Sequence, residues 1–172
     1  MTQEIVYRKL GIIDKVDYHN IRLDCLKNYP ENFGTLFEEE QLSTNFKFDK
    51  IIDQNYLTDF LAGAFKDDRL IGICGYIQEK RQKTIHIGEL SGMYVMTEFS
   101  GQQIGKGLLN FTIENAFKNS ILEQIILAVA DKNKNAQNLY LKNGFKEYGR
   151  LKNYFKYQGE YETQVLMVLT RD

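Results

Sequence analysis

The chain has 172 residues, 43% of them hydrophobic, which is long enough for one domain to bury a core without disulfide or metal staples. We therefore expect a single domain over residues 1–172. The formal net charge is -1, so no basic field indicates nucleic acid or an anionic membrane surface as a partner. Cys25 and Cys74 have no metal-binding spacing and follow no secretory or transmembrane segment. We expect two buried thiols in a metal-free, cytoplasmic protein.

The first 60 residues combine one strand with several helices. A strand is predicted over 4–10 and a helix over 14–28, with Asp14 as its N-cap. Over 29–60 the periodicity fades at Pro30, Gly34 and the acidic run 38–40, which indicates short helices and loops. One helix is expected around 49–59. Five apolar side chains of this region should pack inward: Phe33, Leu36, Phe37, Phe46 and Phe48.

The rest of the chain alternates strands with helices. Strands over 61–66, 70–80 and 84–96 should form an antiparallel meander, with a tight turn at 67–69. An amphipathic helix over 103–119 leads to the apolar run 125–130, which is typical of a buried strand parallel to the 84–96 strand. A helix over 133–143 ends at Gly144, and strands over 145–157 and 161–170 form a hairpin about Gln158-Gly159.

The segment 90–109 is the most informative, because an apolar strand passes through a glycine-bearing loop into an amphipathic helix. The first turn of a helix has amide N–H groups without intrahelical partners, and its dipole favours an anion. Glycines let the loop backbone approach a phosphate closely. Neither a Walker loop nor a dinucleotide fingerprint fits: three residues separate Gly101 from Gly105, and Gly107 follows Lys106 where a Walker loop has Ser or Thr. The segment therefore predicts a phosphate cradle of another kind.

Two motifs together resemble those of the GCN5-related N-acetyltransferase (GNAT) family. The pattern V-x-x-x-x-[R/Q]-G-x-G-[I/L]-G-x-x-L-L matches residues 95–109, and N-x-x-A-x-x-L-Y-x-x-x-G-F matches residues 133–145. The resemblance covers nearly the whole chain and implies a mixed α/β fold: a largely antiparallel sheet, one central splayed parallel strand pair, and helices on both faces. Ser100 and Gln103 depart from the pattern. A Cβ at Gln103 should crowd the phosphate and weaken affinity for coenzyme A unless the local φ is negative.

The resemblance also implies where acetyl-CoA binds. Backbone groups of Met93, Tyr94 and Val95 would pair with the pantetheine arm as an added strand. Six residues would surround the pyrophosphate: Gly101, Gln102, Gln103, Ile104, Gly105 and Lys106. Asn133 matches an asparagine that hydrogen-bonds the pantetheine, although an N-cap of the following helix explains it too.

Two residues are candidates for acid–base roles. Tyr140 matches the tyrosine that protonates the departing thiolate, and its alternative role is a core aromatic. The attacking amine must be neutral, and an alkylammonium with a pKa of ~10 is only about one part in a thousand free base at pH 7. Glu89 stands where some family members carry a glutamate base; its alternatives are binding a cationic acceptor or capping the sheet. His86 on the same strand is a second candidate.

The acceptor should sit between the first helices and the last hairpin. Tyr29, Phe33, Phe37 and the glutamates 38–40 would present aromatic and acidic groups to a cationic amine, although a solvated helix face explains the glutamates equally well. An edge strand of the C-terminal half is able to pair across a homodimer, but no spacing requires it.

The resemblance therefore implies an N-acetyltransferase that moves an acetyl group from acetyl-CoA to a primary amine of a small molecule or peptide. The amine would attack directly in a ternary complex, without a metal. The alternative is a non-catalytic acyl-CoA-binding sensor or scaffold. The departures at Ser100 and Gln103 favour this alternative, whereas Tyr140 and Glu89 favour the enzyme.

Overall fold

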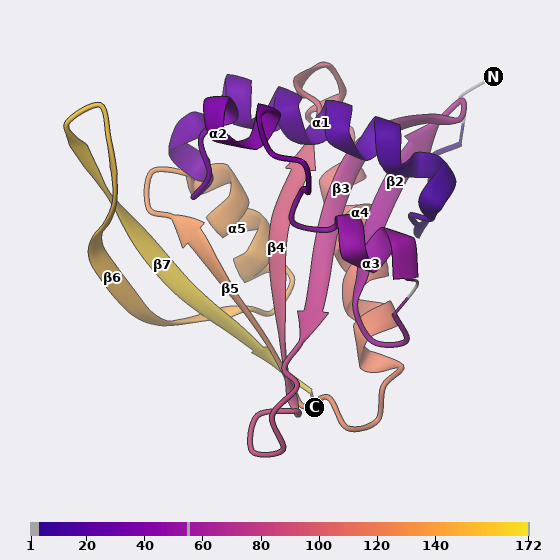
Figure 1. Ribbon diagram of the computed structural model, residues 1–172. Helices are drawn as coiled ribbons and strands as arrows, with labels where there is room; N and C mark the ends of the chain where they lie inside the picture. The colour runs from indigo at the N-terminus through magenta and orange to yellow at the C-terminus, as the bar shows by residue number, and fades with distance from the viewer. Residues whose placement is uncertain (1–3, 55, 172) are drawn as a thin grey trace.

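The computed structural model describes residues 4–54 and 56–171, and their strands form one sheet. Seven strands follow the order β1-β2-β3-β4-β5-β7-β6 within these residues. Their bounds are β1 (Val6–Lys9), β2 (Phe60–Lys66), β3 (Arg69–Gln78), β4 (Ile87–Val95), β5 (Gln124–Ala130), β6 (Lys146–Tyr157) and β7 (Glu160–Thr170). β4 and β5 are parallel, and the other neighbouring pairs are antiparallel. The predicted mixed α/β fold, with its meander, parallel pair and final hairpin, is confirmed (Figure 1).

Helices cover both faces of the sheet. Their bounds are α1 (Lys15–Asn28), α2 (Phe37–Gln41), α3 (Asp49–Gln54), α4 (Ile104–Phe117) and α5 (Lys134–Lys142), with short 3-10 turns at Ile12–Asp14, Pro30–Asn32 and Thr97–Phe99. Successive residues of a strand point to opposite faces. Ala62 and Ala64 accordingly pack with α4 and α5, whereas Leu61 and Phe65 pack with α1 and α3. In Figure 1, α1 crosses one face of the sheet above β2, β3 and β4.

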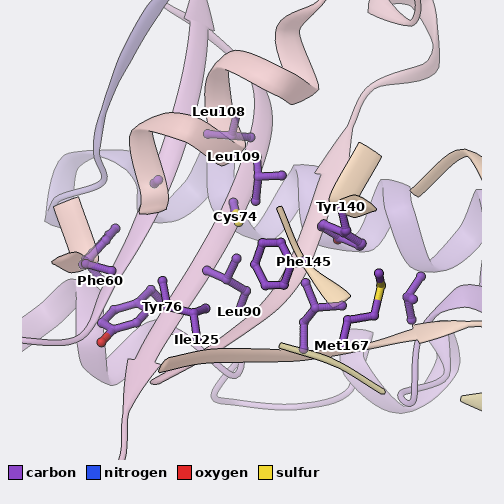
Figure 2. Close-up of a cluster of buried hydrophobic side chains, with 14 of the residues drawn as sticks. Phe60, Cys74, Tyr76, Leu90, Leu108, Leu109, Ile125, Tyr140, Phe145 and Met167 are labelled. Carbon is purple, nitrogen blue, oxygen red and sulfur yellow. The ribbon is translucent and has the colours of Figure 1, made fainter. Parts of the chain in front are cut away.

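The core on the α4 and α5 face brings the second half of the chain together. Leu108 and Leu109 of α4 are fully buried, and they share this cluster with Cys74, Tyr140 and Phe145 (Figure 2). The spacing of the apolar residues in α4 puts its buried side chains on the face that covers the sheet. The helix is thereby fixed against β2 and β3, with its N-terminus at the end of β4.

Three sequence expectations need correction. Asp14 does occupy the N-cap position of α1, but its carboxylate accepts hydrogen bonds from Arg8 at 2.7 Å and from the Gly11 amide at 2.8 Å. The Arg8 guanidinium draws the carboxylate away from the helix and holds its pKa below the ordinary value.

The other two corrections concern element bounds. The helix expected over 49–59 ends at Gln54, and residue 55 lies outside the described residues. The strand expected over 84–96 begins at Ile87 instead, because residues 84–86 form a turn before β4. No described helix is long and apolar enough to cross a membrane.

Candidate active site

The parallel pair β4 and β5 separates soon after it begins. Its register contains three pairs, the last of which joins Glu89 to Ile126. The register of β4 against β3 shifts close to Gly92, whose φ of +64° is a conformation that glycine adopts at little cost. A bulge of this kind bends a strand, and Figure 1 shows β4 and β5 diverging. Beyond Glu89, the edge of β4 that faces β5 has no strand partner in the described chain.

A cavity of about 390 Å³ lies at this separation and reaches both faces of the sheet. Met93, Leu127 and Tyr140 line it from the core shared with α4 and α5. Tyr18 and Phe48 line it from the core beneath α1. The cavity therefore connects the two faces where the strands part, so a group held on one face can meet a group held on the other.

The predicted phosphate cradle adjoins this cavity. None of the hydrogen bonds among residues 4–54 and 56–171 uses the amide N–H groups of residues 101–106. These amides lead into the N-terminus of the 14-residue helix α4, where the helix dipole is positive. A methyl group added at Gly105 would lie 3.7 Å from Cε of Met93, which places the cradle next to the cavity wall. The loop thus offers unpaired donors beside the free edge of β4.

Members of the cradle differ in what their side chains do. Ile104 is 2% exposed and packs into the core, while Gln102, Gln103 and Lys106 are exposed. Gln103 has a φ of +63°. The Cβ would spare the phosphate only at a negative φ, so we expect it to crowd a phosphate bound here. A residue with a Cβ in this left-handed conformation is strained, and glycine would relieve that strain.

Tyr140 combines a core position with a hydroxyl directed at the cavity. The side chain is 8% exposed, and its ring lies 5.7 Å from the ring of Phe145 (Figure 2). Its hydroxyl donates to Sδ of Met93 at 3.6 Å, and sulfur is a weak acceptor. Burial raises the pKa of Tyr140 above the ordinary phenol value, and the neighbouring Cys74 acts in the same direction. The hydroxyl therefore keeps its proton at neutral pH.

Asn133 is the N-cap of α5, as the alternative interpretation predicted. Its Oδ1 accepts a hydrogen bond from the amide N–H of Ala136 at 3.1 Å. The same residue lines the cavity, and no hydrogen bond within the described chain uses its side-chain nitrogen. The cap occupies the carboxamide oxygen and leaves the nitrogen as a donor.

Glu89 and His86 have different surroundings. Glu89 is exposed, belongs to the last register pair between β4 and β5, and lines the cavity. His86 precedes β4 and is not among the residues that line this cavity. Its carbonyl oxygen accepts from the amides of Glu123 and Gln124, which fixes the start of β5. The expectation that His86 lies on the same strand is therefore wrong.

The side chain of Tyr94 belongs to the fold. Its hydroxyl donates to Oδ2 of Asp24 at 2.7 Å, and its ring lies 5.9 Å from the ring of Tyr29. Tyr29 in turn shares a hydrogen bond of 2.9 Å with Thr97. The predicted binding role of Met93, Tyr94 and Val95 concerns their backbone, which lies on the free edge of β4.

The wall beneath α1 lies between the first helices and the last hairpin, as expected for the acceptor site, but most of its residues are not those expected from the sequence. Phe33 lines the 390 Å³ cavity, whereas Tyr29, Phe37 and the glutamates 38–40 are absent from its described lining. Glu40 is buried and accepts from Nε of Arg22 at 3.1 Å. The polar and aromatic lining residues that sequence reasoning missed come from several distant elements and belong to neither motif: Tyr18, Arg22, Lys47, Ser91, Tyr154, Phe155 and Gln164. One available signal was Gly92, because a glycine inside a strand pattern indicates a bulge.

The two thiols do not line this cavity, although Cys74 lies near Tyr140 in the core. Cys25 and Cys74 are free and buried, and neither is among the residues lining the cavity. Burial raises the pKa of Cys25 to about 11 and that of Cys74 to about 12. A thiol with so high a pKa is a poor nucleophile at neutral pH, because the thiolate is the reactive form.

The parallel strand pair thus parts beside unpaired helix-terminal amides, and a cavity lies at the same point of the sheet. The sequence also matches the profile described as "Acetyltransferase (GNAT) family" over residues 18–145. The chain belongs to this family.

Solved structures resemble this fold over almost its whole length. One is an acetyltransferase of the GNAT family from Streptococcus pneumoniae, with a TM-score of 0.80, 21% identity, and coverage of 98% of this chain and 100% of that chain. A ribosomal-protein-alanine N-acetyltransferase from Brucella melitensis has a TM-score of 0.79 and 20% identity, covering 96% and 99%. A putative acetyltransferase from Salmonella typhimurium, solved with its cofactor acetyl-CoA, has a TM-score of 0.82 and 14% identity, covering 98% and 94%.

Proposed function

We propose that the chain is a cytoplasmic, single-domain N-acetyltransferase that transfers an acetyl group from acetyl-CoA to a primary amine of a small molecule or peptide. The observation that carries the proposal is the cavity through the sheet, which has Tyr140 on one side and Glu89 on the other. A thioester on the first side and an amine on the second would meet between the separated strands. The reaction is a direct transfer, because neither buried thiol lines the cavity.

The chain's own groups suit acetyl-CoA, which supplies the acetyl group as a thioester. The unpaired amides of residues 101–106 would hold the pyrophosphate without requiring a basic side chain. The free edge of β4 at Met93, Tyr94 and Val95 would pair with the amide groups of the pantetheine arm. The side-chain nitrogen of Asn133 would donate to the same arm. These groups orient the ligand along β4 toward Tyr140.

Glu89 is proposed to take the proton from the acceptor amine, directly or through one water. Its carboxylate stands at the end of the paired segment, where the cavity opens. General-base help of this kind contributes about 100-fold or more to a rate.

Tyr140 is proposed to donate a hydrogen bond to the departing thiolate. A thiol with a pKa of ~8.5 leaves as thiolate, and the buried phenol is the weaker acid. Complete proton transfer from Tyr140 to the thiolate is therefore uphill, so the hydroxyl acts chiefly by stabilising negative charge on sulfur.

The test is an acceptor screen that follows release of free thiol from acetyl-CoA, with binding measured separately by calorimetry. We expect turnover with at least one amine, and a loss of about 100-fold in kcat/KM in Glu89→Gln with an unchanged Kd for acetyl-CoA. Glu114→Gln is the matched control, because Glu114 is exposed on α4 and absent from the cavity lining. Acetyl-CoA binding without turnover of any amine would contradict the proposed N-acetyltransferase activity and support the acyl-CoA-binding sensor instead.

A further inference from the structure

The carboxamide of Gln164 is a buried polar group without a partner. Gln164 lies on β7 opposite Ala130 of β5 and is 4% exposed. Its Nε2 makes no hydrogen bond within the described chain, yet the residue lines the 390 Å³ cavity. Its neighbour Val165 packs into the core with α4 and α5, so Gln164 points to the α1 face. A buried amide without a partner costs free energy, which a ligand with an acceptor oxygen would recover.

A positive charge lies on the same side of the cavity. Nζ of Lys47 donates to Oγ of Ser91 at 3.0 Å and lies 5.7 Å from the ring centroid of Phe48. Lys47 takes part in no ion pair among the described residues, whereas the Arg22 guanidinium is balanced by Glu40. Of the two cationic residues in the described lining, Arg22 is paired with a carboxylate and Lys47 is not.

The ammonium of Lys47 contacts Ser91 of β4, and Glu89 lies two residues earlier on the same strand. Ser91, which holds Lys47, follows Glu89 by two residues and so shares its face of the strand. Two residues along a strand span about 7 Å. The wall thus presents a carboxylate and an ammonium in a row, and the rings of Phe33, Phe48 and Phe155 supply apolar surface beside them.

From this arrangement we infer that the acceptor is an amino carboxylate, a molecule that carries a carboxylate near its primary amine. The amine lies against Glu89, and the carboxylate is received by Lys47 and the carboxamide of Gln164. The apolar rings favour an amino acid with an apolar side chain. A polyamine would instead place a cation beside Lys47. The inference rests on the proposed function and specifies the substrate class of the same site.

The test compares leucine with leucinamide, which keeps the amine and side chain but lacks the carboxylate. We expect kcat/KM for leucine to exceed that for leucinamide by about tenfold or more. Lys47→Gln should remove this preference by slowing leucine and leaving leucinamide nearly unchanged. Lys50→Gln is the matched control, because Lys50 is exposed on α3 and outside the cavity lining.

Gln164 is tested as a positioning residue by two substitutions. Gln164→Leu removes an unpaired buried amide, so we expect the ligand-free protein to melt at a higher temperature while kcat/KM for leucine falls about tenfold. Gln164→Glu places a carboxylate at the same position and should shift the preference toward leucinamide.

The outcomes separate the two proposals. Equal turnover of leucine and leucinamide, or turnover confined to polyamines, would overturn the inference and leave the N-acetyltransferase intact. Failure to bind acetyl-CoA would overturn the proposed function itself, and the inference with it. Loss of leucine turnover in Lys47→Gln with unchanged acetyl-CoA binding would support both.

Discussion

Gln103 is the position at which the cradle departs most from a relaxed backbone. Its φ of +63° and ψ of 4° place a side chain with a Cβ in the left-handed region directly before α4. This conformation costs ~1 kcal/mol for a residue other than glycine. Glycine avoids that cost but loses ~0.5 kcal/mol through its greater freedom in the unfolded chain. Gln103→Gly should therefore raise the free energy of unfolding by ~0.5 kcal/mol.

The same substitution should tighten acetyl-CoA binding. Removing the Cβ lets the amides around residue 103 approach a phosphate without contact from a side chain. We expect Kd to fall about threefold, which corresponds to ~0.7 kcal/mol. Isothermal calorimetry measures the affinity, and thermal unfolding should shift upward by about 1–2 °C.

Two controls isolate the cause. Gln103→Ala shortens the side chain but keeps the Cβ, so its affinity should stay within about twofold of the original. Gln102 is not among the residues with positive φ, so Gln102→Gly should destabilise the fold by about 0.5–1 kcal/mol. Equal effects of glycine at positions 102 and 103, or equal binding by Gln103→Gly and Gln103→Ala, would refute this reasoning.

Three further results are expected. Tyr140→Phe should lower kcat about 100-fold and leave the Kd for acetyl-CoA unchanged, measured by steady-state kinetics and calorimetry; an unchanged kcat would refute the role of the hydroxyl. Asn133→Ala should lose the N-cap hydrogen bond from Ala136 and ~1 kcal/mol of stability. Asn133→Ser should keep this hydrogen bond but weaken acetyl-CoA binding, as measured by calorimetry. Unchanged acetyl-CoA binding by Asn133→Ser would show that Asn133 acts only as the N-cap. The folded pKa of Asp14 lies below 3.8, so its ion pair with Arg8 stabilises the fold at neutral pH and is lost as the pH falls through that lower value. Urea unfolding of Asp14→Asn should show lower stability at pH 7 and a weaker dependence on pH below 4; an unchanged dependence would contradict this.

The loop of unpaired amides before α4 could be predicted because its backbone pattern is local. Unpaired amides at a helix N-terminus follow from a contiguous run of sequence, and glycines such as Gly101 reveal where the backbone must turn. The parallel pairing of β4 with β5 followed from the same kind of pattern, since the run over residues 125–130 is apolar on both faces. Local physics therefore identified the strands and helices that frame the cavity.

The wall beneath α1 could not be predicted in this way. Arg22, Lys47 and Gln164 come from α1, from the segment before α3 and from β7, and only the assembled sheet brings them to one cavity. The glutamates 38–40 suggested a cationic acceptor. The sequence alone could not show that one of them, Glu40, is already paired with Arg22. Asp14 failed as a side-chain cap for the same reason, since Arg8 competes for its carboxylate.

The central claim is that the unpaired amides of residues 101–106 hold the pyrophosphate of acetyl-CoA, with its thioester beside Tyr140. The most direct measurement is a calorimetric titration of the folded protein with acetyl-CoA, set against S-acetylpantetheine, which lacks the pyrophosphate. We expect saturable heat with acetyl-CoA and a Kd at least about tenfold weaker for S-acetylpantetheine. No heat of binding at an acetyl-CoA concentration of about 1 mM, or equal affinity for the two ligands, would contradict it.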